Sequence, residues 1–171
     1  ELLSTRIVSE YLNQQNLKNS WLDARKVIHT NNNWREGKVI WDFTKTFSKM
    51  FIEELFNTVD VIIIQGFIGV EPDGFTTTLG REGSDYTAAI LAHCTNAESV
   101  TVWKDVEGIL SADPKKIPNA QKFDDLTYRE VVEMSYYGAT VIHPKTLKPL
   151  ADKNIPLYVK SFIDTTKKGT V

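Results

Sequence analysis

This chain has little cysteine, no large excess of charge of either sign, and no long apolar segment. A single cysteine, Cys94, excludes an internal disulfide. The three histidines, His29, His93 and His143, show no metal-ligand spacing with one another or with Cys94, so no zinc site is expected. A net charge of −2 gives no basic field for a nucleic acid. Since no segment is long and apolar enough for a membrane span or a secretion signal, a cytoplasmic protein with neither nucleic acid nor membrane as partner is expected.

What remains is an ordinary composition, with 42% hydrophobic and 25% charged residues over 171 positions. A chain of this length can bury one sizeable core, which predicts one domain or a large part of one. Repeats, low-complexity segments and obvious linkers are absent from the sequence. Cys94 lies in an alanine-rich segment, where a small buried side chain is a simpler interpretation than a nucleophile.

Short apolar runs rich in β-branched residues predict strands. The segment "VDVIIIQGFIGV" (59–70) predicts a strand buried on both faces, and "SVTVWKDV" (99–106) predicts a second one. A last strand is predicted over "IPLYVKSF" (155–162).

Helical patterns lie before and between these runs, over residues 1–12, 43–57, 126–139 and 143–154. The first two carry apolar stripes, Leu3, Ile7 and Tyr11 in one and Phe47, Phe51 and Leu55 in the other. The second stripe is most simply core. The third helix has a capping box, Thr127 with Glu130, and a stop at Gly138. Strands alternating with helices predict an α/β layered fold with a largely parallel central sheet flanked by helices.

The segment "GFTTTLGREGSDYTAAILA" (74–92) is a glycine-bracketed turn that leads into a helix. Backbone N–H groups at a helix N-terminus favour anions, Ser84 or Asp85 can cap the helix, and Arg81 adds a planar cation suited to a carboxylate or phosphate. The segment matches neither the dinucleotide fingerprint nor the P-loop. On this segment alone, a capped helix after a surface loop, with Arg81 solvated, is the simpler interpretation.

Ligands of parallel α/β sheets bind beyond the carboxyl ends of the strands. The first predicted strand leads toward the Arg81 loop. The second leads into "KDVEGILSADPKK" (104–116), which contains Lys104, Asp105 and Lys115. The residues alone leave two interpretations of the second segment open, a nucleotide site and a polar strand end with solvated lysines.

A family resemblance rests on six motifs, "ELLST" (1–5), "QGFIG" (65–69), "TTTLGREGSDYTAA" (76–89), "WKDVEGILSADP" (103–114), "EMSYYGATVIHPKTL" (133–147) and "IPLYVKSF" (155–162) followed by "GTV" (169–171). In this order they resemble the aspartate kinases of the amino acid kinase family. The resemblance implies an ATP-dependent kinase that phosphorylates the side-chain carboxylate of L-aspartate and gives 4-phospho-L-aspartate. That reaction is the first step toward lysine, threonine and methionine. ATP with Mg²⁺ is the implied cofactor, and a homo-oligomer is the implied assembly of the full-length protein.

The aspartate-binding set that the resemblance implies is Glu1, Phe67, Arg81, Glu82, Gly83, Ser84 and Asp85. Arg81 and Ser84 would hold the α-carboxylate, and Phe67 would line the pocket. Asp85, the implied catalytic residue, would face the α-ammonium together with Glu1 and organise the family's lysines. Glu82 replaces a glycine that is usual in the family. A carboxylate nucleophile has no proton to lose, so positioning and charge neutralisation can carry the catalysis.

The nucleotide-binding set that the resemblance implies is Lys104, Asp105, Leu110, Lys115, Thr140 and Val141, and no metal ligands are implied. Four of these depart from the types that are usual in the family. The family commonly has Thr at Lys104, Tyr at Leu110, Arg at Lys115 and Lys at Thr140. A cation lost at Thr140 and gained at Lys104 is either a compensation or a sign of a different nucleotide pose.

The resemblance also implies that residues 1–171 are part of a catalytic domain, without the family's amino-terminal strand and lysine-containing glycine loop or its carboxy-terminal regulatory domains. On that basis the chain by itself is expected to show no appreciable kinase activity. Two alternatives stay open. One is another amino acid kinase, acting on glutamate, N-acetylglutamate or UMP. The other is a ligand-binding module without catalytic activity, which the departures on the nucleotide side motivate.

Overall fold

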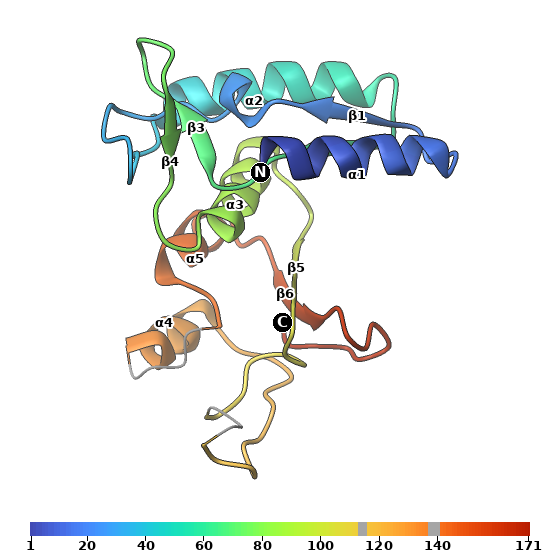
Figure 1. Ribbon diagram of the computed structural model, residues 1–171. Helices are drawn as coiled ribbons and strands as arrows, with labels where there is room; N and C mark the ends of the chain where they lie inside the picture. Colours follow the sequence, from blue (N-terminus) through green and yellow to red (C-terminus); the bar gives the residue numbers. More distant parts are fainter. Residues whose placement is uncertain (113–115, 137–140) are drawn as a thin grey trace. The chain divides into compact units, whose positions relative to one another are not determined.

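The computed structural model describes residues 1–112, 116–136 and 141–171, which form two compact units, Glu1–Thr95 and Asn96–Val171. The predicted α/β class is confirmed in both, since each combines helices with strand pairs (Figure 1). In the described residues the paired strands form three two-stranded sheets, of which two are parallel. No helix in these residues is long and apolar enough to cross a membrane.

The first unit contains α1 (Leu2–Gln14), β1 (Asn19–Leu22), the 3₁₀ helix η1 (Ala24–Lys26), α2 (Trp41–Phe56), β2 (Val61–Ile64), β3 (Ile68–Val70), β4 (Thr76–Thr78) and α3 (Gly83–Thr95). Strands β1 and β2 pair in parallel, with Asn19 opposite Val61. Strands β3 and β4 form an antiparallel hairpin, with Ile68 opposite Thr78. Helices α1 and α2 both contact β2, and α3 packs on α2.

The core of the first unit gathers apolar side chains from η1, β3 and the central turns of α2 and α3. Its fully buried members include Ile28, Leu79 and Ile90. Cys94 belongs to the same core, which confirms its interpretation as a small buried side chain.

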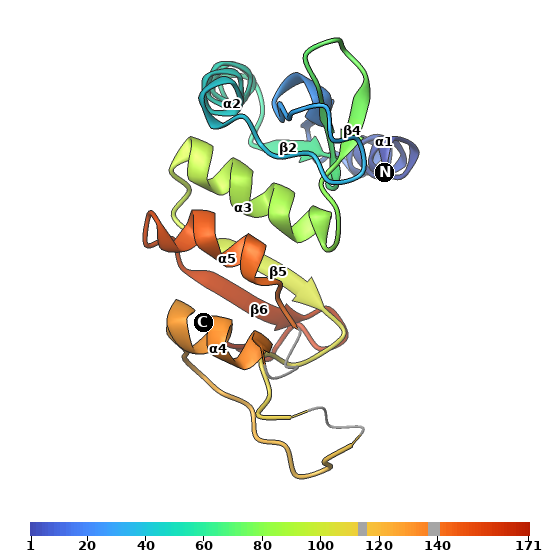
Figure 2. The same cartoon turned by 90° about the vertical axis from the view of Figure 1, so that its left-hand side faces the viewer.

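The second unit contains β5 (Val100–Lys104), α4 (Tyr128–Tyr136), α5 (Pro144–Ala151) and β6 (Leu157–Ser161). Strands β5 and β6 pair in parallel, with Lys104 opposite Ser161, and α4 and α5 lie beside them (Figure 2). The capping box at α4 is confirmed, because Thr127 N–H and Oγ1 both donate to Glu130 Oε2 at 2.7 Å. The predicted stop at Gly138 lies outside the described residues.

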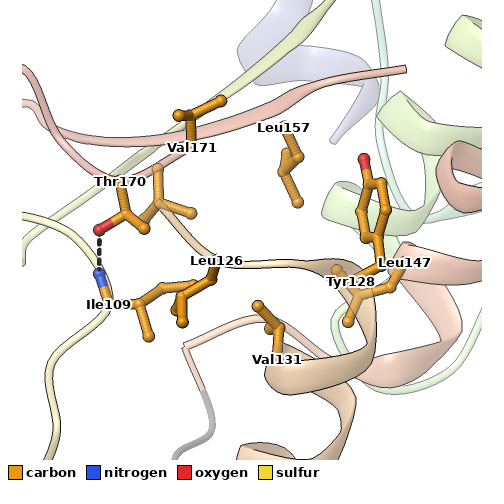
Figure 3. Close-up of a pocket in the computed structure, with 9 residues that line it drawn as sticks. Ile109, Leu126, Tyr128, Val131, Leu147, Leu157, Thr170 and Val171 are labelled. Carbon is orange, nitrogen blue, oxygen red and sulfur yellow. Dashed lines mark hydrogen bonds between the residues drawn. The ribbon is translucent and has the colours of Figure 1, made fainter. Parts of the chain in front are cut away.

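Between β6, α4 and α5 lies a small apolar cavity of about 30 Å³ (Figure 3). At one side, the Ile109 N–H donates to Thr170 Oγ1 at 2.9 Å, and Thr170 Oγ1 donates to the Phe123 carbonyl at 2.6 Å. The Tyr128 hydroxyl donates to the Ile155 carbonyl, and burial raises the pKa of Tyr128 to about 12. A space of this size holds about one water molecule, so it is a gap in the core and not a nucleotide pocket.

The apolar run at 59–70 differs from its prediction. It forms two short strands, β2 and β3, which are separated by Gln65, Gly66 and Phe67, and the residues of β2 are half-buried. The chain bends there because Phe67 has a left-handed backbone conformation with φ of 74°, which no β-strand accommodates. Strand β5 also differs from a strand buried on both faces, since its side chains alternate between buried and more exposed positions.

Three helices also differ in detail from their predictions. Helix α3 begins at Gly83, so Ser84 and Asp85 lie inside its first turn and not at the N-cap position. Helix α1 is confirmed, but its apolar stripe is exposed, with Leu3 at 74% and Ile7 at 60%. The apolar stripe of α2 is half-buried, because the smaller Thr44 and Ser48, with Ile52, occupy the innermost face of that helix.

Candidate active site

The amino end of α3 lies directly against the turn between β2 and β3. A Cβ atom added at Gly66 would come within 2.7 Å of the Ser84 Cβ and 2.8 Å of its Cα. A Cβ added at Gly83 would come within 2.6 Å of the Phe67 ring. Both glycines are therefore needed for close approach, and they bring Phe67, Gly83 and Ser84 of the predicted aspartate set together.

Three hydrogen bonds hold this arrangement. The Phe67 N–H donates to Thr87 Oγ1 at 3.0 Å, and the Leu79 N–H donates to the Phe67 carbonyl at 2.8 Å. The Thr87 hydroxyl in turn donates to the Gly83 carbonyl at 2.9 Å. A left-handed backbone costs a non-glycine residue about 1–2 kcal/mol, so Phe67 keeps it because both of its backbone polar groups are paired.

A second polar network connects this turn with the start of α1. The buried Gln65 side chain donates to Thr5 Oγ1 at 3.1 Å and to the Leu22 carbonyl, and its Oε1 accepts from the Ala24 N–H at 2.8 Å. Thr5 Oγ1 donates to the Glu1 carbonyl at 2.9 Å. The "ELLST" segment, which carries Glu1, is therefore fixed to the strand that leads into Phe67.

The charged residues of the predicted set are more open to solvent than this frame. Arg81, Ser84 and Glu1 are exposed, and Asp85 is half-buried in the first turn of α3. Glu82 has a left-handed backbone with φ of 51°, and its Oε2 atom is buried without a hydrogen-bond partner among the described residues. Arg81 and the amino end of α3 therefore lie beside the carboxylates of Glu82 and Asp85. This combination suits a ligand that carries both carboxylate and ammonium groups.

The predicted nucleotide residues lie in the second unit. Lys104 is the last residue of β5 and is half-buried, and its carbonyl accepts from the Phe162 N–H at 3.0 Å. Asp105 follows it and is exposed, while Leu110 and Val141 lie in two other segments and are half-buried. The remaining members of the set, Lys115 and Thr140, lie outside the described residues.

The chain after β5 folds back on itself through backbone pairing. Leu110 bridges Lys122 in antiparallel fashion, and the Ser111 N–H donates to the Gln121 carbonyl at 2.8 Å. Gly108 has φ of 146°, and a Cβ there would come within 2.4 Å of Thr170 Oγ1. A glycine is therefore required where this loop approaches the segment after β6.

Sequence reasoning missed the polar side chains that hold the site, namely Thr5, Gln65 and Thr87. Gln65 left a signal, because a lone amide interrupts an otherwise apolar run. Thr87 left none, since a threonine among alanines is also typical of an ordinary helix. Within the part of the chain that the structure describes, no three His, Cys, Asp or Glu residues are grouped as a metal site.

Residues 1–161 match the amino acid kinase family, so the chain belongs to that family. It is 40% identical to lysine-sensitive aspartokinase 3 of Escherichia coli (strain K12), over all of this chain and 38% of that protein. It also matches the crystal structure of E. coli aspartokinase III in complex with aspartate and ADP, with a TM-score of 0.93 and 39% identity. That match covers 99% of this chain and 38% of the other.

The fold also occurs in proteins of lower sequence identity. UMP kinase of Bacillus anthracis matches 98% of this chain and 63% of its own, with a TM-score of 0.69 and 19% identity. That likeness shows a shared fold alone. The chain spans 38% of the length of the aspartokinase relative above.

Proposed function

We propose that this chain belongs to an ATP-dependent aspartate kinase, which transfers a phosphoryl group from MgATP to the side-chain carboxylate of L-aspartate and gives 4-phospho-L-aspartate. The observation that carries the proposal is the close contact of Phe67 with Gly83 and of Gly66 with Ser84 at the amino end of α3, next to Arg81. The match to the E. coli enzyme solved with aspartate and ADP supports it.

The acceptor site has the groups that L-aspartate requires. Arg81 pairs with the α-carboxylate through its planar cation, and Ser84 donates to the same group. Asp85 and Glu1 face the α-ammonium, and Asp85 also acts as the catalytic residue that organises the cations around the transferred group. The β-carboxylate then lies free to attack, and no base is needed because it has no proton to lose.

Three further residues shape the same site. Phe67 and Gly83 form its walls, since their close approach leaves no room for a side chain at position 83. Glu82 brings an additional negative charge next to the site of a substrate that carries two carboxylates. We expect Glu82 to weaken aspartate binding relative to a glycine, because like charges repel each other across a short distance.

The nucleotide is assigned to the second unit. Lys104, Asp105, Leu110 and Val141 contact it, and Lys115 and Thr140 complete the set outside the described residues. Mg²⁺ enters with the nucleotide, and Asp105 is suited to it because Mg²⁺ typically takes one or two carboxylates together with phosphate oxygens. Bound Mg²⁺ neutralises phosphate charge during transfer.

We also place the protein in the cytoplasm and expect it to form a homo-oligomer, as the family resemblance implies. Light scattering of the purified protein that contains this chain tests the second expectation, since a monomer at working concentration would contradict it.

Two other functions are distinguishable by experiment. Another acceptor, glutamate, N-acetylglutamate or UMP, is compatible with the shared fold, and a ligand-binding module without catalytic activity is compatible with the departures on the nucleotide side. A coupled ADP-release assay on the protein that contains this chain, run with each acceptor and MgATP, separates them. We expect turnover with L-aspartate and little with the other three. Preference for another acceptor overturns the assignment, and calorimetric binding without any turnover identifies the non-catalytic module.

A further inference from the structure

The hydroxyl of Thr87 joins the two walls of the acceptor site by hydrogen bonds. It accepts a hydrogen bond from the Phe67 N–H at 3.0 Å and donates one to the Gly83 carbonyl at 2.9 Å. Thr87 is 3% exposed, so water does not replace either bond. Its hydroxyl therefore links the turn after β2 to the first turn of α3.

We propose that Thr87 is a positioning residue for aspartate binding, which acts through Phe67 and Gly83 without touching the substrate. This inference rests on the proposed function of the site. Phe67 holds a left-handed backbone, and such a conformation persists only where the surrounding structure fixes it. The Leu79 N–H holds the Phe67 carbonyl by a hydrogen bond, and the Thr87 hydroxyl holds the Phe67 N–H in the same way.

Glycine contacts make the position of Phe67 sensitive to small shifts. Gly83 lies so close that an added Cβ would come within 2.6 Å of the Phe67 ring, and Gly66 lies similarly close to Ser84. A turn that moves away from α3 therefore changes the spacing between Phe67 and Ser84. Because a small substrate with two carboxylates and one ammonium depends on fixed spacing of its contacts, loosening this turn weakens its binding.

The chain offers a matched control in the same helix. Thr95 Oγ1 donates to the Leu91 carbonyl at 2.9 Å, four residues earlier, as Thr87 does to Gly83. Thr95→Val removes the same bond within a helix but leaves the acceptor site intact. Thr87→Val removes that bond and also leaves the Phe67 N–H unpaired.

The kinetic test uses the protein that contains this chain. We expect Thr87→Val to raise the KM for aspartate about tenfold, the effect of one unpaired buried N–H, with the KM for ATP within about twofold of wild type. Thr87→Ser restores the hydroxyl and should bring the KM for aspartate back to within about twofold. Thr95→Val should leave both constants unchanged.

The structural test is the hydrogen-exchange rate of the Phe67 amide. It should rise about tenfold or more in Thr87→Val, because its partner is lost, and stay unchanged in Thr95→Val. Wild-type aspartate KM and Phe67 exchange in Thr87→Val would overturn the proposal, and so would equal losses in the two valine variants. If the wild-type protein shows no turnover with aspartate, the proposed function fails instead, and the Phe67 exchange rate alone decides whether Thr87 holds the turn.

Discussion

The two units of this molecule hold their predicted ligand residues in different ways. In the first unit, Phe67, Gly83 and Ser84 meet through glycine contacts and buried hydrogen bonds. In the second unit, Lys104 and Asp105 lie at a strand end, and Asp105 is exposed. The first arrangement is preorganised for a small ligand whose groups must be matched one by one. A larger ligand with a triphosphate can distribute its contacts over several segments, as the second arrangement requires.

Removing the cation of the first unit should have the largest effect. Arg81→Ala should raise the KM for aspartate about 10- to 150-fold and leave the KM for ATP nearly unchanged, because a charge-assisted pair contributes about 1.5–3 kcal/mol. Arg35→Ala, at an exposed arginine of the same unit, is the control. An unchanged aspartate KM in Arg81→Ala would show that this loop does not bind the substrate.

Filling a glycine contact of the first unit should come next. In Gly66→Ala, the new methyl group meets the Ser84 backbone, so we expect a loss of about 1–3 kcal/mol in the free energy of unfolding and a higher aspartate KM. Gly74→Ala is the comparison, since nothing lies within 4 Å of an added Cβ there, although its φ of 90° disfavours a side chain. Gly74→Ala should lower stability without changing the aspartate KM, and equal KM changes in both variants would contradict the assignment.

Mild acid should lower the stability of the first unit before that of the second. His29 stacks on Phe47 at 4.7 Å between ring centroids, its Nε2 is buried with no hydrogen-bond partner in the part of the chain that the structure describes, and burial lowers the pKa of its imidazole. The unfolded chain then binds more protons, so stability is complete above about pH 6.5 and falls as the pH drops below it, by at most about 1.4 kcal/mol per pH unit for one proton.

The measurement is the melting temperature between pH 7 and pH 5. It should fall with pH in the wild type and much less in His29→Phe. In the second unit, hydrogen bonds and neighbouring lysines lower the pKa values of carboxyl groups such as Asp124 and Asp164, so their contributions are lost at more acidic pH. A wild-type slope in His29→Phe would contradict the role of His29.

Relief of strain at Glu82 should be the smallest effect. Glu82→Gly removes a left-handed side-chain residue and a buried unpaired oxygen, so the free energy of unfolding should rise by up to about 1 kcal/mol, or about 2–4 °C in melting temperature. Asn154→Gly, at φ of 53° in the second unit, should gain less because asparagine tolerates this conformation. A destabilised Glu82→Gly would show that the carboxylate has a stabilising partner.

Local signals in the sequence were sufficient for several elements. The capping box at Thr127 correctly predicted α4, and short β-branched runs correctly predicted β5 and β6. These features depend on residues within a few positions of one another. The α/β class followed from their alternation. The candidate site residues came from motif resemblance, and the local physics of the Arg81 loop alone favoured a solvated surface arginine.

Contacts between distant residues explain what the sequence could not predict. Gln65 is the only residue in the run at 59–70 that indicates an interruption of the strand. The run breaks at Phe67 because Leu79 and Thr87, which lie 12 and 20 positions further on, form hydrogen bonds with the Phe67 backbone. The start of α3 at Gly83 depends on the same contacts. The exposure of Leu3 and Ile7 could not be predicted either, because helical spacing shows that a stripe exists and not what covers it.

The central claim is that the two units bind different ligands, and calorimetric titration of three proteins tests it most directly. L-aspartate and MgATP are each titrated into the wild-type protein that contains this chain, into Arg81→Ala and into Asp105→Ala. The account predicts that Arg81→Ala loses aspartate affinity and keeps nucleotide affinity, and that Asp105→Ala does the reverse. Equal losses of both ligands in either variant, at an unchanged melting temperature, would contradict it.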